Sequence, residues 1–214
     1  MAALVVVVAI VVLVLLIYAV FVPAYNIYEY LQRKRGSWKE LTINGDKELL
    51  SFARKHNFPG DGTPENPVVI KNLGKITQQV RIYNVHLHVV IEDTVLEMPQ
   101  YIGLSYDLYI ENCSNIQIRN LTILYSDGSA IYILNSKNIL IEDVSFYTWG
   151  CISSDIYVCK SSNVEIRRFK HYYNDNDEVG ICIEDSSYIY IHDVCIGALF
   201  IHNSKDIPSR ILLR

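Results

Sequence analysis

The chain has 214 residues, and its 19 Lys and Arg against 23 Asp and Glu give a formal net charge of −4 at pH 7. Nucleic-acid binding needs clustered positive charge, so this balance predicts no nucleic-acid partner. The length from about Gly36 to Arg214 is enough for one domain with a sizeable core.

The first predicted element is a membrane-spanning helix within residues 1–30. The 19 residues from Leu4 to Val22 are apolar and carry no charge, and at about 1.5 Å of rise per residue they would span the hydrocarbon core of a bilayer. A secretory signal peptide would instead show a basic start and a small-residue cleavage site, which this segment lacks. We therefore predict an integral membrane protein with a single pass.

A basic cluster follows the apolar segment and bears on topology. Arg33, Lys34 and Arg35 lie directly after it, where they would contact anionic lipid headgroups. The positive-inside rule then places the large domain in the cytoplasm. Two glycosylation tripeptides, at residues 112–114 and 120–122, favour the cell surface instead, but such tripeptides often occur by chance, so the cytoplasm is the predicted side and the cell surface the alternative.

Residues 31–59 contain this basic segment and a predicted cap helix. From Gly45 to Phe58, apolar residues such as Leu49 and Ala53 recur on one helical face. We expect this helix to cover the N-terminal end of the domain that follows, residues 60–214, because open sheet ends invite aggregation. At the other end, the apolar residues 211–213 either fold back over the last coil or meet a partner.

The domain is built from a sequence repeat. Apolar residues alternate within each unit, as in "LYIENCSNIQIRNLTI" and "IYILNSKNILIEDVSF", and period two indicates strands. The units begin 23, 25, 25 and 18 residues apart, at Leu108, Ile131, Ile156, Ile181 and Leu199. Since one such coil cannot bury its inward face alone, stacking of parallel coils is the simplest solution. The predicted fold is all-β, a right-handed parallel β-helix of about six coils.

The segments "GDGTPENPVVI", from Gly60 to Ile70, and "NSKNILIEDV", from Asn135 to Val144, resemble the pectin-lyase-like right-handed β-helix proteins with short parallel-β-helix repeats. The resemblance covers about Gly60 to Ile207. It implies the fold much more than an activity, since members of that class include polysaccharide lyases, carbohydrate-binding or sugar-modifying proteins, and many proteins with no known reaction.

Stacked coils place equivalent residues in columns. One outward column holds Tyr109, Tyr132 and Tyr157, continued by Cys182 and Phe200. Such an exposed aromatic column could bind a ligand such as a sugar ring, form a subunit interface, or simply stabilise the strands by stacking. The three tyrosines are therefore candidate binding residues.

Two further columns favour structural roles. Charges alternate in sign along the first, which predicts ion pairs between coils of little energetic weight: Arg119, Glu142, Arg167 and His192. Small polar residues form the second, at a bend where side chains can satisfy backbone groups: Cys113, Ser136, Ser161, Ser186 and Ser204.

The loops on one edge of the coils contain the remaining candidate binding residues. Trp149 lies in one loop, and Asp175, Asp177 and Glu178 lie in the next. The acidic residues could hold Ca²⁺, but their spacing fits no complete calcium-binding loop, so we predict no metal or other cofactor. The five cysteines show no metal-binding spacing and are expected to be reduced thiols.

Together these features predict a membrane-tethered β-helix that works as a binding or scaffold module without catalysis. Self-association or a protein partner would use the tyrosine face or the C-terminal end. The alternative is a cell-surface protein that binds carbohydrate or cleaves polysaccharide, with the aromatic column and the loop edge as its site.

Overall fold

The computed structural model describes residues 41–77, 79–97, 106–124, 129–147, 154–172 and 180–213, all within one compact unit. The side chains of Cys195 and of residues 209–213 are not described. The predicted membrane helix within residues 1–30 and the basic cluster of Arg33, Lys34 and Arg35 lie outside these ranges. Within the described ranges, no helix has the length and apolarity that a membrane crossing requires.

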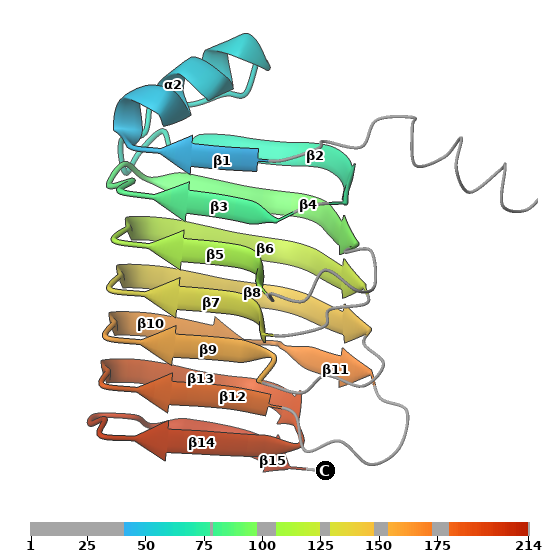
Figure 1. The fold of residues 1–214 in the computed structure, drawn as a ribbon, viewed down its shortest axis with the longest axis vertical. Coiled ribbons are helices and arrows are strands. Elements are labelled where there is room, and N and C mark those ends of the chain that lie inside the picture. Colours follow the sequence, from blue (N-terminus) through green and yellow to red (C-terminus); the bar gives the residue numbers. More distant parts are fainter. Residues whose placement is uncertain are drawn as a thin grey trace, which may run out of the picture. The chain divides into compact units, whose positions relative to one another are not determined.

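The described unit is a mostly-β parallel solenoid (Figure 1). All strand pairs are parallel, and the chain alternates between two sheets as it ascends the stack. The first sheet has seven strands: β1 (Leu41–Asn44), β3 (Val80–Tyr83), β5 (Tyr106–Glu111), β7 (Ser129–Leu134), β9 (Ile156–Cys159), β12 (Gly180–Glu184) and β14 (Ala198–His202). The second sheet is formed by β2 (Val68–Ile76), β4 (Val89–Glu97), β6 (Ser114–Leu124), β8 (Lys137–Tyr147), β10 (Ser162–Arg167), β11 (Lys170–Tyr172), β13 (Ser187–Ile196) and β15 (Ser209–Leu213).

The alternating sequence pattern builds the core between the two sheets. Ile110, Ile133, Val158 and Ile183 are paired in register from strand to strand, and each is 0% exposed. Their outward neighbours along the strands are only partly buried, except for Cys159, which is buried. Period two therefore predicted correctly which face of each strand is inside.

The bends that separate strands depend on residues with positive φ. In the turn that contains β5 and β6 these are Asn112, Asn115 and Asn120, with φ of 52°, 63° and 47°. Asn and Asp tolerate this left-handed conformation better than other residues with a side chain. The same positions recur in the next turn as Asn135 and Asp143, which explains why the repeat places Asn and Asp at its bends.

A short helix, α2 (Asp46–Lys55), lies at the N-terminal end of the stack (Figure 1). Leu49 and Ala53 are buried in the core cluster, and the helix contacts β1 and β2. The amphipathic pattern predicted this helix. The strand before it was not predicted: Leu41–Asn44 pairs in parallel with β3, so the solenoid begins before the helix.

The C-terminal residues add a strand to the solenoid. β15 pairs in parallel with β13, with Ile211 opposite Val194 and Leu213 opposite Ile196. Residues 211–213 therefore extend the second sheet instead of folding back over the last coil. In the first sheet β14 is the terminal strand, with β12 as its partner among the described strands.

Candidate functional site

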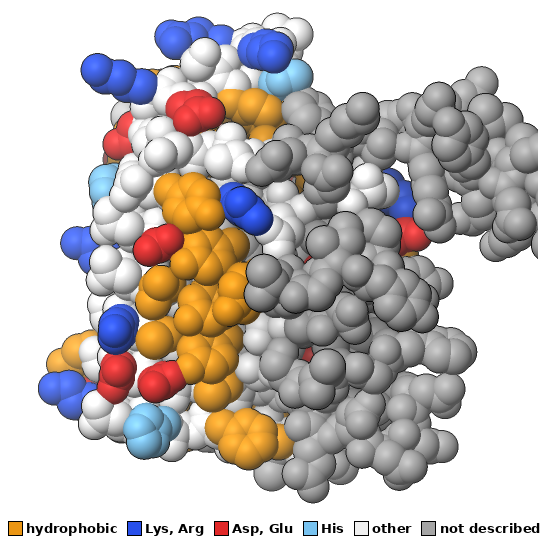
Figure 2. Space-filling view, viewed as in Figure 1, with side chains coloured by type: hydrophobic (Ala, Val, Ile, Leu, Met, Phe, Trp, Pro, Cys, Tyr) orange, Lys and Arg blue, Asp and Glu red, His pale blue; other side chains and the backbone are white. Residues whose placement is uncertain are grey.

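The outward aromatic column predicted from the repeat is present on the first sheet. Tyr109, Tyr132 and Tyr157 are paired in register on β5, β7 and β9. Their rings form a stack, which we call the tyrosine ladder: the centroids of Tyr109 and Tyr132 lie 5.4 Å apart with planes 5° apart, and those of Tyr132 and Tyr157 lie 4.9 Å apart with planes 4° apart. Figure 2 shows apolar side chains gathered in a band along this sheet.

Two further tyrosines extend the aromatic surface. The ring of Tyr83, on β3, lies 5.6 Å from that of Tyr109, and the ring of Tyr106 lies 4.3 Å from that of Tyr132. Both contacts are tilted rather than stacked, at 50° and 48°. The aromatic cluster is thus wider than the single column predicted from the sequence.

Carboxylates anchor the hydroxyl groups of the ladder. Tyr109 donates a hydrogen bond to Glu111 at 3.1 Å, and Tyr157 donates one to Glu184. Burial raises the pKa of the Tyr109 phenol, with help from Glu111, and raises the pKa of Tyr132 to about 12. The hydrogen bond to Glu184 is the main cause of the raised pKa of Tyr157. The hydroxyl groups of Tyr109 and Tyr157 are thus held in fixed orientations, and the raised pKa values keep all three phenols neutral.

The stacking geometry limits what the ladder can bind. Because Tyr132 is stacked on Tyr109 on one side and on Tyr157 on the other, both faces of its ring are covered. A sugar ring stacks on an exposed aromatic face, so the interior of the ladder offers ring edges only. The face of Tyr157 that points away from Tyr132 is followed in register by the small side chain of Cys182.

The alternating charges on the second sheet form the predicted ion pairs. Glu142, whose side chain is 12% exposed, lies 3.0 Å from Arg167 and 3.7 Å from Arg119, and it also contacts Arg168. His192 lies 3.0 Å from Glu165. These charges are paired with one another, and they form a structural network on the outside of the sheet.

The column of small polar residues forms a hydrogen-bond chain along one corner. The backbone N–H of Ser136 donates to Ser161 Oγ at 3.1 Å, and that of Ser161 donates to Ser186 Oγ at 3.1 Å. Cys113 and Ser204 continue the chain at its two ends, at 3.0 Å and 2.9 Å. The predicted structural role of this column is confirmed.

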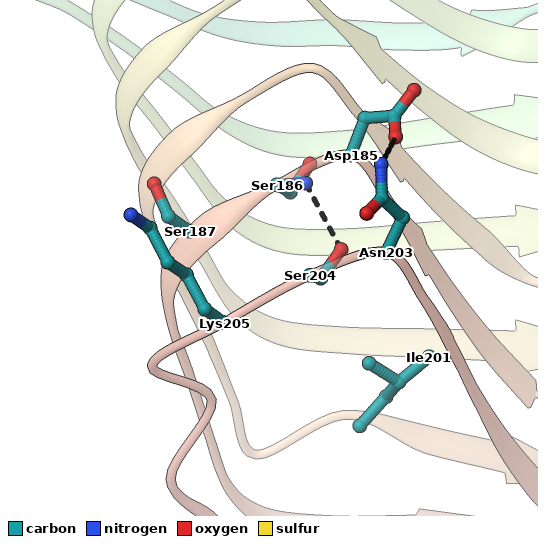
Figure 3. A pocket seen from close by; sticks show the side chains of 7 residues that line it. All are labelled: Asp185, Ser186, Ser187, Ile201, Asn203, Ser204 and Lys205. Carbon is teal, nitrogen blue, oxygen red and sulfur yellow. Dashed lines mark hydrogen bonds between the residues drawn. The ribbon is translucent and has the colours of Figure 1, made fainter.

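At the C-terminal end of the solenoid, no helix of the described ranges covers the core, and we call this end open. Ile201 belongs to the inward column that contains Ile183, yet its side chain is 48% exposed. A surface pocket of about 430 Å³ lies at this end. Figure 3 shows its lining, in which Asn203 donates to Asp185 and the Ser186 N–H donates to Ser204 Oγ at 2.9 Å. The ammonium of Lys205 has no ion-pair partner among the described residues.

Sequence reasoning missed a buried pair of titratable groups. His171 on β11 and Asp155, just before β9, lie 2.8 Å apart, with side chains 2% and 0% exposed. Burial raises the pKa of Asp155, and the hydrogen bond and charge of His171 partly oppose this rise. The repeat alignment contained a signal for His171, because it places this residue opposite the buried Phe146. Nothing in the sequence pointed to Asp155.

The remaining predicted site residues lie outside the described ranges: Trp149, Asp175, Asp177 and Glu178. Over the residues that the structure describes, no group of three His, Cys, Asp or Glu side chains could hold a metal ion. Cys113, Cys159 and Cys182 are free thiols.

One comparison with known proteins supports the fold. Residues 106–201, which are 96 of the 214 residues, match a family model described as "Right handed beta helix region". The match runs from β5 to β14 and covers about four turns of the solenoid. No curated protein and no solved structure matches the chain. Over residues 106–201, the chain is therefore similar to right-handed β-helix proteins.

Proposed function

We propose that the chain is a membrane-tethered scaffold whose β-helix binds a second copy of itself through its open C-terminal end, without chemistry of its own. The main support is the exposure of one core position. Ile183 is 0% exposed, whereas Ile201, the next residue of the same inward column, is 48% exposed. A core residue left in water at the end of a stack marks a surface that gains from being covered.

The asymmetry of the two ends favours a closed dimer. At the N-terminal end α2 covers the core, with Leu49 and Ala53 buried. At the C-terminal end the outer edge of β14 has no partner among the described strands. One open end per molecule permits pairing of two identical ends about a two-fold axis, and it blocks growth into a filament.

The rim of the open end has charges of both signs. Asp185 and Lys205 line the same pocket, and Asp206 follows in the chain and is exposed. In a two-fold arrangement each surface faces a copy of itself, so a surface with both signs can pair with itself where a surface of one sign would repel. This mixture is compatible with self-association.

The membrane tether is part of the proposal. It rests on the uncharged run from Leu4 to Val22, and the adjacent Arg33, Lys34 and Arg35 favour a cytoplasmic β-helix. A tether confines the copies to one surface and raises their effective concentration, so a weak end-to-end contact would suffice. A cysteine at position 205, in a background without the native cysteines, would resist a membrane-impermeant thiol reagent on intact cells and react after lysis.

The carbohydrate alternative has less support. The stacked faces of the tyrosine ladder are closed to a sugar ring, and Arg167 and Glu142 are paired with each other at 3.0 Å. Release of unsaturated product from a uronate polymer by the purified chain, with or without Ca²⁺, would contradict the scaffold proposal and favour the alternative.

The mass of the purified full chain in detergent tests the self-association. We expect two chains per particle for the unmodified protein and one chain for Ile201→Lys, because a buried ammonium would oppose pairing of the ends. Tyr190→Lys is the matched control, since Tyr190 is 42% exposed on the second sheet, and this variant should keep two chains. A single chain in the unmodified protein, or two chains in Ile201→Lys, would overturn the proposal.

A further inference from the structure

The tyrosine ladder has a gap near its C-terminal end. In register, Tyr157 is followed by Cys182 on β12 and by Phe200 on β14. An aromatic side chain thus occupies the column before and after Cys182, and a small thiol lies between. The side chain of Cys182 is partly exposed and that of Phe200 is 51% exposed.

The size of the gap matches one ring. Adjacent strands in a sheet lie about 4.8 Å apart, so Tyr157 and Phe200, two strands apart, are separated by about 9.6 Å along the stack. A ring placed midway would lie about 4.8 Å from each neighbour. The ladder itself uses this spacing, with centroids 4.9 Å and 5.4 Å apart. An inserted ring would continue the ladder.

The chemistry of the gap favours an aromatic ring. In register, Tyr157 and Phe200 flank it on the two adjacent strands, and Cys182 lies between them. Among the described residues, the polar groups beside it in register are Glu184, which accepts the Tyr157 hydroxyl, and His202, which is paired with Glu184. A pyranose carries hydroxyl groups around its whole rim and would need more partners than these two side chains supply. A flat ring with one polar edge needs fewer.

We propose that this gap, bounded by Tyr157 and Phe200 over Cys182, binds one aromatic side chain, that of a Trp or Tyr residue, from a protein partner. The inserted ring acts as the anchor of the contact, in the way that buried Trp and Tyr side chains dominate protein interfaces. The site is on the flank of the first sheet and goes beyond the proposed end-to-end pairing, because it would serve to hold a different protein on the scaffold.

Protection of the Cys182 thiol tests the site directly in the full chain. The probe is N-acetyl-tryptophanamide, the control is N-acetyl-leucinamide, and a methyl glucoside represents a sugar. The rate of alkylation of Cys182 is followed by mass spectrometry of its peptide, with the buried Cys159 as internal reference. A single ring binds with a dissociation constant on the order of millimolar, so about 10 mM of the aromatic probe should slow alkylation at least two-fold.

Variants of the wall and the floor separate this site from general apolar binding. Phe200→Ala removes one wall and should abolish the protection by the probe. Cys182→Phe fills the gap, so it should raise the melting temperature and remove the saturation-transfer NMR signal of the probe, whereas the matched variant Cys182→Ser should keep that signal.

Three results would overturn the proposal: equal protection by the leucine or sugar compound, protection that survives Phe200→Ala, or an undiminished probe signal in Cys182→Phe. The particle mass of each variant is measured on the same sample. Cys182→Phe should leave two chains per particle, so failure of the ring site and failure of self-association give different results.

Discussion

His171 Nδ1 lies 2.8 Å from a carboxylate oxygen of Asp155, and the two side chains are 2% and 0% exposed. His171 is paired in register with Phe146, which is 0% exposed, so a titratable side chain takes the place of an apolar one in the core. The second oxygen of Asp155, Oδ1, has no hydrogen-bond partner in the described part of the chain. The carboxylate therefore depends on His171.

We predict that the two residues are strongly coupled. His171→Phe alone would leave a buried carboxylate without its partner and should lower the free energy of unfolding by about 3 to 5 kcal/mol. Adding Asp155→Ala should recover most of this loss, since the column of Asp155 contains Ala130 and Gly180 on the adjacent strands. Denaturant unfolding of both single variants and the double variant measures the coupling. Additive effects would contradict it.

The same pair predicts a pH dependence. Burial raises the pKa of Asp155 in the folded chain, so the folded state holds this proton more tightly than the unfolded state does. The contribution of Asp155 is thus fully present below the ordinary pKa of an aspartate and is lost as the pH rises through the folded pKa. In His171→Phe, where the opposing effect of His171 is gone, stability should fall more steeply with rising pH. The dependence of the unfolding free energy on pH that Asp155 causes should disappear in His171→Phe/Asp155→Asn.

The repeat allowed the stacking of the coils to be predicted from the sequence, but it did not predict every strand. Offsets of 23 and 25 residues correctly placed Tyr109, Tyr132 and Tyr157 in one column, because stacking in parallel register follows from the repeat itself. β1 was missed, since α2 and β2 separate it from its partner β3 and its four residues are too few for an alternating pattern to stand out.

The buried pair escaped prediction for a different reason. Arg168 has a φ of 50°, and such a bend resets the alternation of inward and outward residues, so simple parity along β10 does not predict the direction of His171. The contact joins β11 of the second sheet to Asp155, which lies just before β9 of the first sheet. Local periodicity contains no information on contacts across the core.

Removal of one hydroxyl group from the hydrogen-bond chain along the corner should lower the stability of the fold. Ser161 Oγ accepts the N–H of Ser136 and donates to the Cys159 carbonyl at 2.8 Å, and Ser161 is 4% exposed. Ser161→Ala would leave the Ser136 N–H unsatisfied, although the Cys159 carbonyl would still accept the N–H of Asn135, and it should cost about 1 to 3 kcal/mol. Ser145→Ala, at a partly exposed outward position of β8, is the control in thermal and denaturant unfolding. Equal stability of the two variants would contradict this role.

The tyrosine ladder should stabilise the fold through the stacking of its rings rather than through the hydroxyl group of Tyr132. Aromatic pairs are worth about 0.5 to 1.5 kcal/mol each, and Tyr132 has two stacked neighbours, so Tyr132→Ala should lower the unfolding free energy by about 1 to 3 kcal/mol. Tyr132→Phe keeps the ring and should cost less than about 0.5 kcal/mol. A large loss in Tyr132→Phe, measured in the same unfolding experiment, would show that the hydroxyl matters more.

Ionisation of the ladder should limit stability in alkali. Burial raises the pKa of Tyr132 to about 12, so the folded state keeps a proton that the unfolded state releases near the ordinary pKa of tyrosine, about 10. The contribution of Tyr132 to the unfolding free energy is fully present below about pH 10 and is lost as the pH rises towards 12. The difference in phenolate absorbance between the unmodified chain and Tyr132→Phe isolates this group. A midpoint equal to that of the denatured chain would contradict the prediction.

The pairing of C-terminal ends is tested most directly by cross-linking in the native membrane. In a chain without its native cysteines, Lys205→Cys places one thiol at the open end and Lys47→Cys places one in α2 at the capped end, and both positions are exposed. A short bismaleimide that enters cells should link Lys205→Cys into a covalent dimer and leave Lys47→Cys as a single chain. Equal linking at the two ends, or no linking at position 205, would contradict the scaffold described here.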